Sequence, residues 1–141
     1  MAEVTARIKL VDGMQMVGET GSGHALIMDG PPHIGGANTG PRPMELLLVG
    51  MGGCTTIDVV DILKKGRHQV SGCEVLIKGI RAETEPKVYV TIGVHYIVKG
   101  RELPPAAVER AIKLSEDKYC SASAMLGKTA TIQSTYEIIE G

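Results

Sequence analysis

The chain has 141 residues and a mass of 14.9 kDa, with 43% hydrophobic and 22% charged residues. These values are typical of a folded globular domain and not of a disordered chain, so we predict a single domain over residues 1–141. The 15 basic and 16 acidic residues leave a net charge of −1, and the chain contains neither Trp nor Phe. Without a basic field or large aromatic rings for base stacking, we expect no nucleic-acid partner.

The pattern of charges also argues against a membrane protein. The longest uncharged apolar stretch, 46–57, has 12 residues, whereas a membrane span needs about 20. Charged residues interrupt the first ten positions, so they do not resemble a signal peptide. We therefore expect a cytoplasmic protein with no membrane partner.

The first 43 residues predict a three-stranded meander followed by a long loop. Residues 3–11 alternate between apolar and polar side chains, which is typical of a half-buried strand, and the Asp12-Gly13 pair predicts a hairpin turn. Further strands are expected at 14–19 and 24–28. Residues 29–43 contain four prolines and four glycines, so we expect no regular structure there, and either a flexible surface loop or a lid over a site.

A long helix is predicted from Pro43 to the Lys64-Lys65 pair. Before Lys64 the helical stretch 44–65 carries only three charges, which predicts burial on nearly all sides. Because a chain of this length has little material to surround such a helix, we predict an obligate homodimer. The glycines at 50, 52 and 53 weaken a helix, so we expect either a close approach of another backbone or a break in the helix there.

The rest of the chain predicts two strands, two helices and a last strand. A turn at 84–87 joins strands at 70–83 and 88–99, with bulges expected at Gly79 and Gly93. A helix begins at Pro104-Pro105, a shorter one is capped by Ser121 or Ser123, and a strand covers 130–139. The predicted fold is α+β, with antiparallel sheets around a long buried central helix.

Metal and nucleotide sites are not indicated. The four histidines are scattered, and the chain lacks C-x-x-C, H-x-x-x-H and zinc-finger spacings, a phosphate-binding loop and a dinucleotide fingerprint. We therefore predict no metal and no cofactor. The three cysteines remain as candidate reactive groups.

The cysteines differ in what surrounds them. Cys73 lies among apolar strand residues and is expected to be a packing residue. Cys54 follows two glycines, which leave room for a substrate. If the helix breaks at those glycines, the amides of its second segment would lower the pKa of Cys54 and favour the reactive thiolate.

Two cysteine motifs resemble those of the OsmC/Ohr family of small thiol peroxidases. One is PMELLL at 43–48 followed by Gly-Gly-Cys at 52–54, and the other is Lys-Tyr-Cys-Ser at 118–121. The motifs look most similar to the less characterised YhfA-type branch. The resemblance implies an intertwined homodimer in which the thiolate of Cys54 reduces an organic hydroperoxide and becomes a sulfenic acid. It further implies that Cys120 resolves this acid as a disulfide, which an external dithiol then reduces.

One position departs from the family pattern. Well-studied members have a glutamate directly after the proline, where it orients an arginine that supports the thiolate; here that position is Met44, and Glu45 follows it. One residue corresponds to about 100° of helix rotation, so Glu45 is a candidate catalytic residue whose direction differs. Arg42 is the nearest candidate for the arginine in sequence.

Two other functions remain open at this stage. The five methionines between positions 14 and 51 and the Met44 departure also fit a stress-response module that binds a small hydrophobic ligand at the dimer interface. A structural dimer with inert, buried cysteines is the third possibility.

Overall fold

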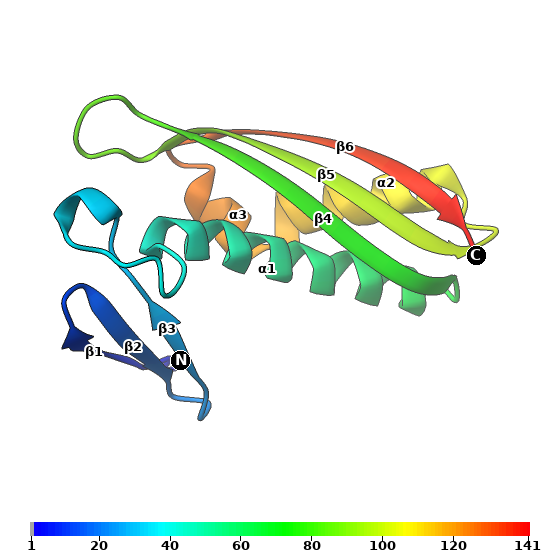
Figure 1. The fold of residues 1–141 in the computed structure, drawn as a ribbon. Helices are drawn as coiled ribbons and strands as arrows, with labels where there is room; N and C mark the ends of the chain where they lie inside the picture. The colour runs from blue at the N-terminus through cyan, green and yellow to red at the C-terminus, as the bar shows by residue number, and fades with distance from the viewer. Residues whose placement is uncertain (1) are drawn as a thin grey trace. The chain divides into compact units, whose positions relative to one another are not determined.

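A computed structural model describes residues 2–141, which divide at Leu47/Leu48 into two compact units (Figure 1). Each unit carries a three-stranded sheet. The predicted order of three strands, a helix, two strands, two helices and a strand is confirmed, and so is the α+β class.

The first unit is built on an antiparallel meander. Its strands are β1 (Ala6–Asp12), β2 (Gln15–Thr20) and β3 (Ala25–Met28). Gly13 in the first turn has a φ of +53°, the left-handed conformation expected there. The half-buried β1 predicted from its alternation is wrong for the chain by itself, since every residue of that strand is exposed.

The loop after β3 is irregular, as predicted, apart from a single 3₁₀ turn, η1 (Pro32–Ile34). It is organised around Asp29, which is only 1% exposed. The carboxylate of Asp29 accepts hydrogen bonds from the backbone amides of Gly30, Ala37 and Thr39 and from the Thr39 hydroxyl, at 2.7–3.1 Å. These bonds lower the pKa of Asp29 from 3.8 to about 2, with the Thr39 hydroxyl as the largest cause.

The low pKa of Asp29 predicts a pH-dependent contribution to stability. The folded pKa lies below the unfolded one, so the contribution is complete above about pH 4 and is lost as the pH falls toward 2. We expect Asp29→Asn to unfold at a lower urea concentration than wild type at pH 7. At pH 2 the difference between the two unfolding midpoints should be smaller. An equal difference at both pH values would contradict this account.

The second unit holds a sheet with the order β4-β5-β6 and helices on one face (Figure 1). Its strands are β4 (Gln69–Arg81), β5 (Tyr89–Arg101) and β6 (Thr131–Glu140). The first two are antiparallel, but β6 runs parallel to β5. The prediction of antiparallel pairing is therefore wrong for this strand, because two helices carry the chain back along the sheet before β6 begins.

The inner face of β5 forms much of the core. Alternation along 88–99 predicts one apolar face of six residues, from Val88 to Val98 at every second position, and four of them are buried, namely Ile92, Val94, Tyr96 and Val98. The sheet register shifts opposite Ile80–Arg81, so Val90 turns outward and Tyr89 is buried in its place. The expected bulges at the strand glycines are wrong, since pairing runs unbroken through Gly79 and Gly93.

Helix α1 (Pro43–Lys65) has the predicted bounds. It is long and apolar enough to cross a membrane by length and composition. Within the chain, however, it packs one face inward, with Met51, Thr55, Val59 and Leu63 buried. Burial on nearly all sides is therefore not reached within one chain, because Val49 and Ile57 remain 66% and 70% exposed.

The glycines of α1 do not break it, since the helix is continuous from residue 43 to 65. A Cβ at Gly52 would lie 3.0 Å from the side chain of Ile77, so the close neighbour is a side chain and not another backbone. Gly50 and Gly53 face open space. The break that would place a new helix N-terminus beside Cys54 is therefore absent.

The segment before Cys120 contains an irregular turn. Helix α2 (Pro105–Leu114) runs into a π-helical turn, η2 (Ser115–Tyr119), and α3 (Ser121–Leu126) follows. The Cys120 amide donates to the Ser115 carbonyl at 2.7 Å, which closes the wide turn. The extra residue in this turn moves Tyr119 outward, to 50% exposed, and Cys120 inward, to 2% exposed. Tyr119 was predicted on the inner face and is not there.

Candidate active site

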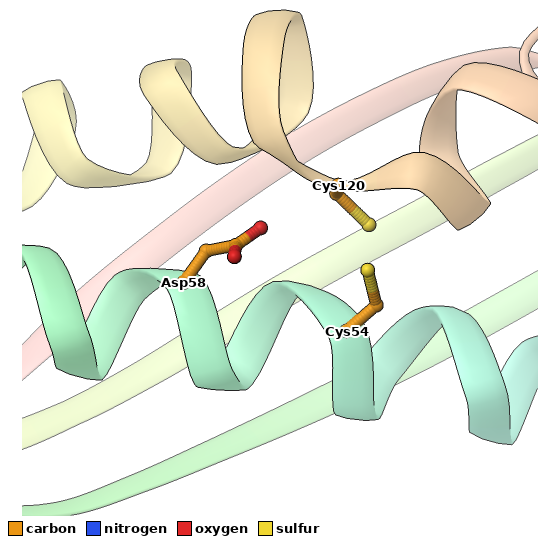
Figure 2. Close-up of side chains that lie close together, drawn as sticks. All are labelled: Cys54, Asp58 and Cys120. Atoms are coloured by element: carbon orange, nitrogen blue, oxygen red, sulfur yellow. The ribbon is translucent and has the colours of Figure 1, made fainter. Parts of the chain in front are cut away.

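Cys54 and Cys120 approach each other although 66 positions separate them in the sequence. Both are free thiols, and their sulfur atoms lie within 4.8 Å of each other. Cys54 projects from α1 and Cys120 from the junction of η2 and α3, and Figure 2 shows the two side chains pointing toward one another. A disulfide between them requires only a small movement.

The two thiols have different surroundings. Cys54 is half-buried, whereas Cys120 is buried and forms the N-cap of α3. The sulfur of Cys120 accepts hydrogen bonds from the backbone amide and the hydroxyl of Ser123, at 3.3 and 3.1 Å. The cap was predicted at Ser121 or Ser123, but the cysteine itself takes this position because the π turn ends there.

Burial raises the pKa of the Cys120 thiol, and its hydrogen bond to Cys54 raises it further, although the two bonds from Ser123 act in the opposite direction. Cys120 therefore keeps its proton more firmly than an ordinary cysteine does. Of the two sulfurs, the half-buried Cys54 is the one that a bulky oxidant can reach first.

Asp58 lies one helical turn after Cys54 and is the third member of this group (Figure 2). One of its carboxylate oxygens lies within 4.8 Å of both sulfur atoms. The Ser115 hydroxyl donates a hydrogen bond to Asp58 Oδ2 at 2.9 Å. This bond links the helix that carries Cys54 to the turn that carries Cys120.

A chain of buried hydroxyl groups continues from Ser115 into the core. The Thr55 hydroxyl lies 2.7 Å from Ser115 Oγ and 2.9 Å from the Tyr96 hydroxyl. Tyr96 donates to Glu116 at 2.8 Å, and Ser134 donates to the other carboxylate oxygen of Glu116 at 3.0 Å. Burial raises the pKa of Tyr96 above its ordinary range, so the phenol stays protonated.

Glu45, the third predicted site residue, has a structural contact. Its carboxylate accepts a hydrogen bond from the Arg42 amide at 2.7 Å, the backward bond of a helix capping box. The Arg42 guanidinium donates to Asn38 and to the Gly40 carbonyl. Both residues lie in the first unit, whereas the thiol pair lies in the second.

The remaining thiol and two of the methionines are packed inside the chain. Cys73 is half-buried on β4, and burial raises the pKa of its thiol. Met28 and Met51 are core residues, where methionine commonly fills irregular gaps between other side chains.

Among residues 2–141, Cys54, Asp58 and Cys120 form the one group that could hold a metal ion. Structural zinc sites use four protein ligands and catalytic ones three with a water, so a group of three candidate ligands does not by itself indicate a resident metal. We assign it no metal.

Comparison with known proteins identifies the family. The family model described as OsmC-like protein matches residues 35–135. Protein YhfA of Escherichia coli strain K12 is 46% identical over 134 residues, which are 95% of this chain and 97% of that protein. The chain belongs to the OsmC-like family.

Solved structures agree with this result. A hypothetical protein from Aquifex aeolicus VF5 is 31% identical, with a TM-score of 0.88 over 100% of this chain and 99% of that one. An organic hydroperoxide resistance protein from Elizabethkingia anophelis is 15% identical, with a TM-score of 0.75 over 99% and 98% of the two chains. The second likeness shows the fold alone. The resemblance predicted from the two cysteine motifs is confirmed.

Several residues around the thiols of this OsmC-like protein were not predicted from the sequence. Asp58 is not among the predicted site residues, although its four-residue spacing from Cys54 puts both on one helix face. Thr55 follows Met51 and precedes Val59 and Leu63 at the same spacing, which was a signal for burial. Glu116 and Ser134 carry no such signal.

Proposed function

We propose that this OsmC-like protein is a thiol-dependent peroxidase that reduces organic hydroperoxides, with Cys54 as the attacking thiol and Cys120 as the resolving thiol. The observation that carries the proposal is the approach of two free sulfur atoms to within 4.8 Å. Family membership supports a redox role in stress response.

The reaction has three steps. The Cys54 thiolate attacks the O–O bond, which breaks and releases an alkoxide that takes up a proton to become the alcohol, and Cys54 becomes a sulfenic acid. Cys120 attacks this sulfur, and the thiol proton leaves with the hydroxyl group as water. An external dithiol then reduces the Cys54–Cys120 disulfide by exchange.

The differing environments of the thiols support this division of roles. Cys120 is only 2% exposed, and burial raises its pKa, so it makes a poor first nucleophile for a bulky peroxide. Cys54 is more accessible.

Glu45 was predicted as a third catalytic residue. Its carboxylate is hydrogen-bonded to the backbone amide of Arg42, so its part in catalysis stays a separate proposal. Replacing it with glutamine separates the two roles, because glutamine at this helix position also completes a capping box.

A homodimer also belongs to this proposal. The exposed face of α1 presents Val49, Gly50, Gly53 and Ile57, and a Cβ at either glycine would meet no atom within 4 Å. Small residues between exposed apolar ones suit close contact between two helices. We propose that a second copy of the chain covers this face. We also propose that the chain is a single domain and that the protein is cytoplasmic.

The test of the function is a turnover assay with cumene hydroperoxide and dithiothreitol. We expect dithiol oxidation that depends on protein concentration and is faster than with hydrogen peroxide, which is the preference that the family resemblance implies. No turnover with any of several alkyl and aryl hydroperoxides would reject the peroxidase. A ligand-binding module would instead leave both thiols unchanged.

A further inference from the structure

A chain of short contacts joins Asp58 to Glu116 through the hydroxyl groups of Ser115, Thr55 and Tyr96. The four oxygen–oxygen distances are 2.9, 2.7, 2.9 and 2.8 Å in that order. The three residues that bear the hydroxyl groups are all fully buried, at 0% exposed. All four distances are those of hydrogen bonds between oxygen atoms.

If both carboxyl groups are ionised, this chain has one proton fewer than its four hydrogen bonds require. Each of four hydrogen bonds needs a proton, and three hydroxyl groups supply three. With Ser115 donating to Asp58 and Tyr96 donating to Glu116, the single Thr55 proton serves only one of its two neighbours. A buried pair of oxygen atoms without a proton between them is costly.

We propose that Asp58 and Glu116 share one additional proton through this hydroxyl chain, and that Asp58 delivers it to the alkoxide released at Cys54. When Asp58 holds the proton, every bond runs in one direction: Asp58 donates to Ser115, Ser115 to Thr55, Thr55 to Tyr96, and Tyr96 to Glu116. When Glu116 holds it, all four bonds reverse.

The position of Asp58 fits this delivery. Its carboxylate lies within 4.8 Å of both sulfur atoms, so the O–O bond that Cys54 attacks lies close to this carboxylate when the alkoxide leaves. A protonated Asp58 also spares the site a second negative charge beside the Cys54 thiolate. This second part of the proposal rests on the proposed peroxidase function.

The proton balance is closed. Attack of the thiolate on the hydroperoxide breaks the O–O bond, and the alkoxide takes the proton from Asp58 to give the alcohol. The thiol proton of Cys120 leaves with the sulfenic hydroxyl as water when the disulfide forms. Glu116, whose second oxygen is bonded to Ser134 at the exposed end, returns a solvent proton to Asp58 through the chain.

Two isosteric variants should remove the shared proton in different ways. In Asp58→Asn the new amide donates to Ser115, which keeps the hydrogen-bonded chain but offers no acidic proton. In Glu116→Gln the new amide donates to Tyr96, so the bonds run toward Asp58 and leave it ionised. This variant therefore acts on Asp58 from the far end of the chain, across three hydroxyl groups. Thr56→Ala is the matched control, because the Thr56 hydroxyl lies on the same helix, donates to the Gly52 carbonyl at 2.7 Å and is not part of the chain.

Infrared difference spectra test the shared proton without any activity. Wild type and T56A should show the carbonyl band of one protonated carboxyl group at pH 7, and D58N and E116Q should both lack it. If the band persists in either D58N or E116Q, the proposal of a shared proton is overturned.

Rapid-mixing measurements of sulfenic acid formation test the delivery. An alkoxide needs a proton as it leaves, whereas the acetate released from peracetic acid does not. We expect D58N and E116Q to react about 100-fold more slowly with cumene hydroperoxide, the usual scale of general acid catalysis. Their rates with peracetic acid should change less than about threefold, as should both rates of T56A.

An equal loss with both oxidants would show a merely structural role for Asp58 and overturn the delivery. Wild-type protein that reacts with neither oxidant would instead reject the proposed function and leave the infrared result to stand by itself.

Discussion

Replacing Cys54 with serine is expected to abolish peroxidase turnover, with a loss of more than about 1,000-fold, because the attacking sulfur is gone. Replacing Cys120 with serine has a different expected result. The first oxidation then proceeds, and the sulfenic acid accumulates on Cys54, since the sulfur within 4.8 Å that would condense with it is absent.

Dimedone labelling followed by peptide mass spectrometry separates the two variants. We expect the label on Cys54 in C120S treated with one equivalent of cumene hydroperoxide, and no label on Cys120 in C54S. Cys73→Ser is the matched control, because this half-buried thiol lies on β4 outside the pair, and it should turn over as wild type does. A label on Cys120 in C54S would reverse the assignment of the two thiols.

The second large effect concerns the assembly. Ile57 is 70% exposed at the middle of an apolar helix face, beside the open space at Gly53. If a second copy covers this face, Ile57→Lys buries an unpaired charge in the interface, which is strongly unfavourable. We expect wild type at twice the chain mass of 14.9 kDa and I57K at the chain mass itself.

Light scattering coupled to size exclusion measures both masses directly. Lys64→Ala is the matched control, since it changes a charge in the last turn of the same helix. A wild-type mass of 14.9 kDa at micromolar concentration would reject the homodimer, and an unchanged mass for I57K would reject this face as its interface.

The sequence predicted the elements of this fold well because their signals are local. Alternation along β5 and the prolines at the starts of α1 and α2 depend only on neighbouring residues. The parallel direction of β6 was missed, because it depends on where α2 and α3 return the chain to the sheet. The sequence also did not show which face of α1 is buried within the chain, because that face includes the polar residue Thr55.

The candidate site was predicted in part. Two cysteine motifs pointed to Cys54 and Cys120, but no local signal shows that a π turn moves Cys120 inward in place of Tyr119. The hydroxyl chain was missed for a related reason. Its members come from α1, β5 and η2, and polar residues so far apart in sequence show their connection only after folding.

The central claim is that the two sulfur atoms act on each other. Peptide mapping of wild-type protein after one equivalent of cumene hydroperoxide measures this directly, with free thiols blocked before digestion. The account predicts one Cys54–Cys120 disulfide, a loss of two hydrogens from each chain, and an unmodified Cys73 thiol. Two fully alkylatable thiols at positions 54 and 120 after this treatment would contradict it.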